Sequence, residues 1–209
     1  MLKVNGVGYT LPDGRVLFSD VELGLVPGDA IAIEGPSGTG KSTLLAVLGG
    51  LLEPRDGRVL NESTREAPFA WVLQSLNGLT ARSVLANACL LGVLDGESLG
   101  EVRKRAMSLL TELGLDRHCD KRAKQLSGGE LQRLAVARAL ASTRPVILAD
   151  EPTNQLDRDN ARRVMRLLFE SAAVDQRIVI VVTHDRDALP PECRVVTLTA
   201  SGLMDRPWI

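Results

Sequence analysis

At 209 residues, the chain is long enough for one large domain with a sizeable core. Its 44% apolar and 24% charged residues exclude a disordered chain, and the net charge of -1 shows no sign of the basic surface that nucleic-acid-binding proteins use. The three cysteines lack any spacing typical of disulfides or metal sites. The N-terminus lacks the apolar segment of a signal peptide, and no apolar run reaches the length of a membrane span. We therefore expect another chain to supply any membrane spans.

The N-terminal part of the chain is expected to form strands and one helix. Asp13-Gly14 separates two short apolar runs and is a strong signal for a β-hairpin. A buried strand is expected at 30–34, followed by a glycine-rich loop and then by a helix over 43–52. The strands expected next are 58–63 and 69–74.

From about residue 77 the pattern becomes helical, with leucines three or four residues apart. We expect an inserted helical lobe over about 77–133, within a single domain of residues 1–209. Strand and helix then alternate again, with helices at 130–142 and 161–173 and strands at 146–150, 177–183 and 195–199. This alternation of apolar strands with helices predicts an α/β fold with a mainly parallel sheet, covered on both faces.

The loop after the 30–34 strand matches the phosphate-binding pattern G-x-x-x-x-G-K-[ST] in full. Its glycines let successive backbone N–H groups turn toward phosphate oxygens, and the following helix adds the positive end of its dipole. Lys41 would neutralise the β- and γ-phosphates of a nucleotide, and the Ser42 hydroxyl would ligate Mg²⁺. The nucleotide-binding residues expected here are Gly35, Pro36, Ser37, Gly38, Thr39, Gly40, Lys41, Ser42 and Thr43. The loop alone leaves GTPases, kinases and helicases possible.

A second anion-binding loop narrows the choice. The run Leu126-Ser127-Gly128-Gly129-Glu130 opens a helix and lies between the P-loop and a later acidic strand end. Ser127 is a natural N-cap, and Gly128 and Gly129 let bare N–H groups approach a phosphate closely. This run resembles the signature motif of ATP-binding cassette (ABC) ATPases. In that family, the loop closes over the γ-phosphate held by the P-loop of the other subunit.

The strand at 146–150 ends in Asp150 and is followed at once by Glu151. In the light of the resemblance, this pair looks like the Walker B motif, whose aspartate holds Mg²⁺ and whose glutamate acts as general base. A carboxylate beside the metal can orient a water molecule in line with the phosphorus atom. The resemblance therefore assigns Asp150 to the metal and Glu151 to catalysis.

Three smaller motifs of the family also have counterparts. Gln74 corresponds to the glutamine that reaches the metal or the attacking water and senses the membrane partner. His184 corresponds to the switch histidine that contacts the γ-phosphate. Residues 154–157 take the place of the loop that touches the opposite subunit, which puts Asp157 beside the nucleotide. This loop reads Asn-Gln-Leu-Asp, which departs from the commoner Ser-Ala-Leu-Asp.

Two aromatic residues receive different interpretations. In the family, an aromatic residue of the first hairpin stacks on adenine, and Tyr9 is the single tyrosine of this chain. The alternative for Tyr9 is a half-buried strand aromatic with no contact to the nucleotide. Trp71 is expected to pack in the core.

The resemblance runs from Tyr9 to about Leu198 and implies the ABC ATPase fold. This is a P-loop NTPase core with a mainly parallel sheet, an antiparallel β lobe and an inserted helical lobe. The resemblance also implies that ATP and Mg²⁺ bind and that two subunits, identical or different, pair head-to-tail on ATP.

The function expected is ATP hydrolysis that drives a separate permease from the cytoplasmic face of the cell membrane. The compact length and the segment after Gln74 are most similar to the lipoprotein-release and macrolide-export group, which includes a cell-division ATPase with a mechanical output. A soluble ABC-type translation factor is the alternative, because residues 150–157 are similar to those factors, although they normally carry two cassettes. The lack of heptads argues against a chromosome-maintenance ATPase, and the intact catalytic positions argue against a regulatory pseudo-ATPase.

Overall fold

The structure, a computed structural model, describes residues 1–63, 68–73 and 80–205. It contains a six-stranded sheet of order β5-β6-β7-β3-β8-β9 and a three-stranded sheet of order β2-β1-β4. The strands of the large sheet are β3 (Ala30–Glu34), β5 (Phe69–Val72), β6 (Val146–Asp150), β7 (Ile178–Val182), β8 (Arg194–Thr199) and β9 (Gly202–Asp205). The strands of the small sheet are β1 (Leu2–Thr10), β2 (Val16–Leu25) and β4 (Asp56–Asn61).

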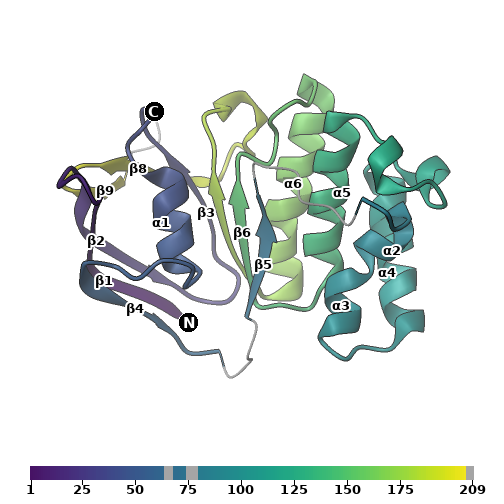
Figure 1. The fold of residues 1–209 in the computed structure, drawn as a ribbon, viewed down its shortest axis with the longest axis horizontal. Coiled ribbons are helices and arrows are strands. Elements are labelled where there is room, and N and C mark those ends of the chain that lie inside the picture. The colour runs from purple at the N-terminus through teal and green to yellow at the C-terminus, as the bar shows by residue number, and fades with distance from the viewer. Residues whose placement is uncertain (64–67, 74–79, 206–209) are drawn as a thin grey trace.

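Five neighbouring strands of the large sheet are parallel, and β9 pairs with β8 in the antiparallel direction. Helix α1 (Lys41–Leu48) lies on one side of this sheet with the small sheet, whereas α5 (Gly128–Ala141) and α6 (Arg158–Asp175) lie on the other side (Figure 1). Strands β6 and β7 are buried along their whole length because both faces are covered. Their residues alternate between two cores: Leu148 packs toward α1, and Ile147 packs toward α5 and α6.

Three helices beside α5, on its side away from the sheet, build most of the segment expected to be helical (Figure 1). They are α2 (Val84–Ala88), α3 (Leu90–Leu94) and α4 (Leu99–Glu112), followed by the short 3₁₀ helices η1 (Asp116–His118) and η2 (Ala123–Gln125). A polar connection fixes them to the sheet: Nη2 of Arg144 lies 2.8 Å from Oδ1 of Asp95, and its Nη1 donates to the Phe69 carbonyl oxygen at 2.8 Å. The limits of this lobe, about 77 and 133, stay a prediction.

The structure confirms the expected α/β order, with differences at element ends. The hairpin around Asp13-Gly14 is the antiparallel pair β1–β2. The helix expected over 43–52 begins earlier and ends at Leu48, because Gly49 caps it and Gly50 takes a left-handed φ of 71°. Strand β9 was not anticipated, since it has four residues and half of them are exposed. Among the described helices, none combines the length and the apolarity that a membrane crossing requires.

Trp71 packs at the edge of the core, as expected, and its indole occupies the space beside Gly49. A Cβ atom at position 49 would lie 2.0 Å from Cζ2 of Trp71 and 2.9 Å from a methyl carbon of Leu148. We expect Gly49→Ala to lower the free energy of unfolding by about 1–3 kcal/mol, because the added methyl group overpacks this contact. Urea unfolding measures the loss.

Gly100→Ala serves as the matched control, because no atom lies within 4 Å of a Cβ built on that glycine. It should leave the stability unchanged or raise it slightly, since alanine favours the helix. Equal stability of Gly49→Ala and the wild type would contradict the overpacking argument. In a Trp71→Leu background the penalty of Gly49→Ala should shrink.

Candidate nucleotide-binding and hydrolysis site

The phosphate-binding loop connects the end of β3 to the start of α1. Gly35 has a φ of 152°, and a Cβ there would lie 2.8 Å from the carbonyl oxygen of Leu198. Gly40 has a φ of 92°, and a Cβ there would lie 3.0 Å from the side chain of Leu17. Side chains at these two positions would collide or be strained, so glycine is what allows the loop to curl back against β8 and the hairpin.

Lys41 closes over this loop. Its Nζ donates to the carbonyl oxygens of Gly35 at 2.8 Å and Pro36 at 3.0 Å. The ammonium group therefore lies inside the phosphate-binding loop, where two neutral carbonyl oxygens accept its hydrogen bonds. A phosphate oxygen would be a stronger, charged acceptor for the same group.

Asp150, at the carboxyl end of β6, is a buried carboxyl beside the first turn of α1. It hydrogen-bonds the Ser42 hydroxyl, while its Oδ1 is buried and lacks a partner among the described residues. Burial raises the pKa of Asp150, the bond from Ser42 lowers it, and the charge of Glu151 raises it again. A carboxylate oxygen without a partner beside a hydroxyl is a donor set that fits Mg²⁺. Ser42 and Asp150 are therefore the residues that would hold this ion.

We expect Asp150→Asn to stabilise the free protein and to abolish hydrolysis. Because the pKa of Asp150 is raised in the folded state, this group favours folding most below its unfolded pKa, and the contribution is lost as the pH rises through the folded pKa. The stability gain of the variant over the wild type should therefore grow from about pH 4 to about pH 7. A gain of ~1 kcal/mol would raise Tm by about 2–4 °C.

Urea unfolding at each pH measures this difference. Asp120→Asn, at an exposed position, is the control and should show no such trend. If the stability difference between Asp150→Asn and the wild type were constant over this pH range, the raised pKa of Asp150 would be contradicted.

Glu151 and His184 are in direct contact. Nδ1 of His184 lies 2.9 Å from Oε2 of Glu151, and the backbone N–H of His184 donates to the same oxygen at 3.4 Å. Glu151 takes a left-handed φ of 47° and is 9% exposed, whereas the His184 side chain is 74% exposed. The main chain of Glu151 is fixed because its N–H donates to the Val182 carbonyl oxygen at 2.9 Å. A largely buried carboxylate on a fixed main chain thus contacts a solvent-exposed imidazole.

The signature loop is built as a capping box. The backbone N–H of Ser127 donates to Oε2 of Glu130 at 2.7 Å, and the N–H of Glu130 donates back to the Ser127 Oγ at 3.4 Å. The bond from the Ser127 backbone lowers the pKa of Glu130. Gly128 lies against the next loop, because a Cβ there would be 2.0 Å from Oε1 of Gln155. The glycines of the signature therefore contact residues 154–157 of the same chain.

Asp157 acts as the N-cap of α6. Its Oδ1 accepts from the backbone N–H of Asn160 at 2.9 Å, and this bond is the main reason that the pKa of Asp157 is lowered. Its contact with nucleotide stays a prediction. Gln74 lies outside the described residues.

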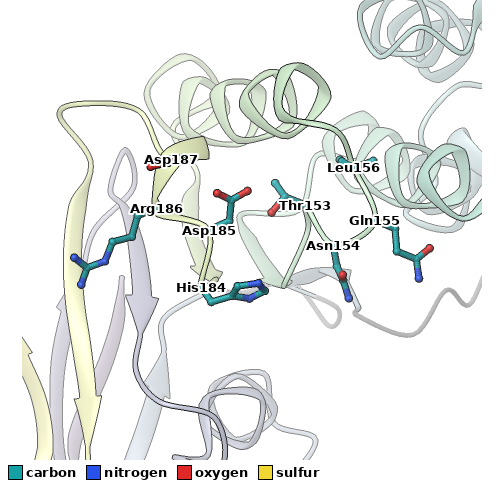
Figure 2. A pocket seen from close by; sticks show the side chains of 8 residues that line it. All are labelled: Thr153, Asn154, Gln155, Leu156, His184, Asp185, Arg186 and Asp187. Atoms are coloured by element: carbon teal, nitrogen blue, oxygen red, sulfur yellow. The ribbon is translucent and has the colours of Figure 1, made fainter.

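One cavity gathers much of the phosphate-binding loop together with Asp150 and Glu151, and a second one lies beside it. The first is lined by Leu11, Arg15, Leu17, Ser37, Gly38, Gly40, Lys41, Ser42, Thr43, Asp150, Glu151 and Val182. The second is lined by residues 153–156 and 184–187, and the imidazole of His184 is directed toward the side of Asn154 (Figure 2). Ser127, Gly128 and Gly129 do not line either cavity. Neither of these two cavities of the described residues is thus lined by both the phosphate-binding loop and the signature loop.

The hairpin contributes residues to the first cavity that sequence reasoning missed. Leu11, Arg15 and Leu17 line it, but Tyr9 does not. Tyr9 is half-buried, with its ring centroid 6.3 Å from that of Phe18. Its stacking on adenine stays a prediction. No motif marks Leu11 or Arg15, and only their place beside the hairpin turn could have suggested them.

Comparison with known proteins identifies the family. A family model described as ABC transporter matches residues 18–154, which include the P-loop, the signature loop and Asp150-Glu151. The chain belongs to the ABC transporter family. It is an ATP-binding cassette with the α/β fold of ABC ATPases, the family that binds and hydrolyses ATP.

Two ABC relatives show how much of a protein the match covers. The lipoprotein-releasing system ATP-binding protein LolD of Psychrobacter arcticus is 37% identical over 204 residues, covering 90% of each chain. The macrolide export ATP-binding/permease protein MacB of Rhodopseudomonas palustris is 37% identical over 214 residues, but these are 32% of its length. The present chain therefore spans about a third of the macrolide-export relative and nearly all of the lipoprotein-release relative.

A solved ABC structure gives the three-dimensional comparison. It is the dimeric post-hydrolysis state of an ATP-binding cassette bound to ADP and Pi, with a TM-score of 0.85 and 31% identity. The alignment covers 99% of the present chain and all of the solved one. The fold therefore has a counterpart in a cassette that was captured after hydrolysis.

Proposed function

We propose that this ABC cassette hydrolyses ATP-Mg²⁺ within a head-to-tail pair and drives a separate membrane permease of the export or lipoprotein-release type. The cavity that joins Lys41, Ser42, Asp150 and Glu151 carries this proposal. Likeness to the lipoprotein-release ATP-binding protein over 90% of both chains supports a subunit whose permease is a different chain. Its place would be the cytoplasmic face of the cell membrane.

The proposed binding step starts from the bonds within the P-loop. Lys41 exchanges the carbonyl oxygens of Gly35 and Pro36 for phosphate oxygens, and the N–H groups of the loop donate to the same phosphates. Ser42 and Asp150 would hold Mg²⁺, which supplies positive charge to the phosphate oxygens when bound. Bound Mg²⁺ would give the buried carboxylate oxygen of Asp150 the partner that it lacks in the free chain.

The proposed chemical step belongs to Glu151. Its main chain is bonded to Val182, its side chain lines the cavity, and the carboxylate can accept a hydrogen bond from a water molecule aimed at the γ-phosphorus. In the free chain His184 occupies one oxygen of this carboxylate. Turning the exposed imidazole toward the γ-phosphate would free that oxygen for water.

A second subunit completes the proposed site. Ser127, Gly128 and Gly129 lie outside the cavity of their own P-loop. The N–H of Ser127 is bonded to Glu130, and the N–H groups of Gly128 and Gly129, at the start of α5, would serve a nucleotide held by a partner. The solved relative is dimeric, and a second copy of the present chain or a related cassette would serve. Exchange of ATP for ADP and phosphate would remove the bridging phosphate and let the pair open.

Mass spectrometry of the proteins that co-purify with a tagged Glu151→Gln variant, from native membranes with ATP, tests the permease. We expect a multi-span membrane protein to be enriched over a Lys41→Ala bait, which should not form the ATP-bound pair. Enrichment of ribosomal proteins without a permease would contradict the transporter function and support a translation factor.

A further inference from the structure

A buried carboxylate lies at the base of the phosphate-binding loop. Glu34 is the last residue of β3, immediately before Gly35, and is 7% exposed. Nε of Arg186 donates to its Oε2 at 2.5 Å, and Nη2 of Arg186 donates to its Oε1. Thr197 Oγ1 of β8 donates to Oε1 at 3.0 Å. This is a bidentate pair with an additional hydroxyl donor, the geometry in which arginine binds carboxylates most strongly.

Arg186 connects this carboxylate to residues 183–188, the switch segment that carries His184. It opens the short helix η3 (Arg186–Ala188), two residues after His184. Figure 2 shows its side chain directed toward the strands of the sheet, whereas His184 is directed the other way, toward the side of Asn154. The backbone N–H of Thr183 also donates to the Ile33 carbonyl oxygen at 3.2 Å. The segment that carries His184 is thus bonded to the end of β3 on both sides of the imidazole.

The other polar contacts of η3 are weaker. The carboxylate of Asp187 lies 3.4 Å from Nη2 of Arg158, and both side chains are at least two-thirds exposed. Exposed pairs of this kind contribute about 0–1 kcal/mol. The pair of Arg186 with Glu34 is different, because one partner is buried and would be left with an uncompensated charge if the pair broke. It is therefore the contact that fixes η3 against the P-loop strand.

We propose that the Glu34–Arg186 pair is a positioning device that holds the switch segment, and hence His184, at a fixed place relative to the phosphate-binding loop. Arg186 is a positioning residue here, since it acts through His184 and does not line the cavity of the P-loop. The inference rests on the proposed role of His184 and Glu151 in hydrolysis. In that role, the pair would keep His184 within reach of the γ-phosphate.

Arg186→Met tests the proposal in the full-length protein. We expect kcat for ATP hydrolysis to fall on the order of ten-fold, because small displacements of a group that contacts the reacting phosphate are costly. KM for ATP should stay within about two-fold, because Lys41 and the loop N–H groups remain in place. Glu34→Gln, which keeps the shape of the side chain, should show the same pattern. The double variant should be no slower than Arg186→Met alone.

A spectroscopic readout separates positioning from general destabilisation. The chain has two histidines, so the imidazole signals of His184 and His118 can be resolved by NMR and assigned with His184→Ala. Arg186→Met should move the His184 signal and leave the His118 signal in place. Arg194→Met, which removes an exposed pair with Asp205 on the same sheet, is the control and should change neither kcat nor the signals.

Unchanged kcat in Arg186→Met would overturn the proposal, and so would a rise in KM that accounts for the whole loss. An unmoved His184 signal would overturn it even if the rate fell. Failure of the proposed function is seen separately. In that case the wild type itself would show no ATP hydrolysis that depends on Lys41.

Discussion

Glu151→Gln is expected to bind ATP with nearly unchanged affinity, to accumulate as a dimer and to hydrolyse ATP about 10²–10³-fold more slowly than the wild type. The amide keeps the size of the side chain but cannot accept the proton of the attacking water. Glu151 is fixed at the carboxyl end of β6 and borders the cavity with Asp150, so the substitution removes a base without removing a phosphate contact. Phosphate release measures the rate of hydrolysis, and light scattering with ATP measures the dimer fraction.

The control for this prediction is Glu170→Gln, an exposed position on α6. Its turnover and its dimer fraction should match those of the wild type. If ATP failed to increase the dimer fraction of Glu151→Gln, the scheme in which ATP joins two subunits would be wrong. If turnover stayed near that of the wild type, another group would have to be the base.

Lys41→Ala is expected to weaken ATP binding by roughly 10²-fold or more, because a charge-assisted contact to the phosphates contributes about 1.5–3 kcal/mol and the loop loses its internal closure as well. In the free chain the ammonium group holds the carbonyl oxygens of Gly35 and Pro36. Removing it therefore affects both the shape of the loop and its charge. Hydrolysis should be undetectable at ATP concentrations that saturate the wild type.

Fluorescent-nucleotide titration measures this loss, and circular dichroism establishes that the variant is folded. Lys104→Ala removes the same side chain from an exposed position on α4 and should bind ATP normally. An unchanged affinity of Lys41→Ala would refute the assignment of the phosphate site.

The sequence was sufficient where a function depends on neighbouring residues. The P-loop, the signature loop and the pair Asp150-Glu151 are each short motifs flanked by a recognisable strand or helix, and the structure has these elements at the expected places. The parallel sheet followed from the same alternation, because apolar strands buried on both faces need helices between them.

The sequence was insufficient where a contact depends on register or on distant residues. Strand β1 pairs with β2 through several register shifts between Val4 and Thr10, so strand periodicity could not show whether Tyr9 or Leu11 faces the P-loop. The Glu34–Arg186 pair joins residues that are 152 positions apart, and no local pattern connects them. The contact of His184 with Glu151 likewise depends on the neighbouring order of β6 and β7.

The close packing of Trp71 on Gly49 has a consequence for how ABC cassettes of this kind can diverge. A side chain at position 49, after the end of α1, would occupy the same space as the ring at position 71 on β5. Positions 49 and 71 are therefore constrained as a pair. Relatives with a residue larger than glycine at position 49 should carry a ring smaller than indole at position 71. A library that varies both positions together should recover such compensated pairs, and libraries that vary either position alone should return mostly the present residues.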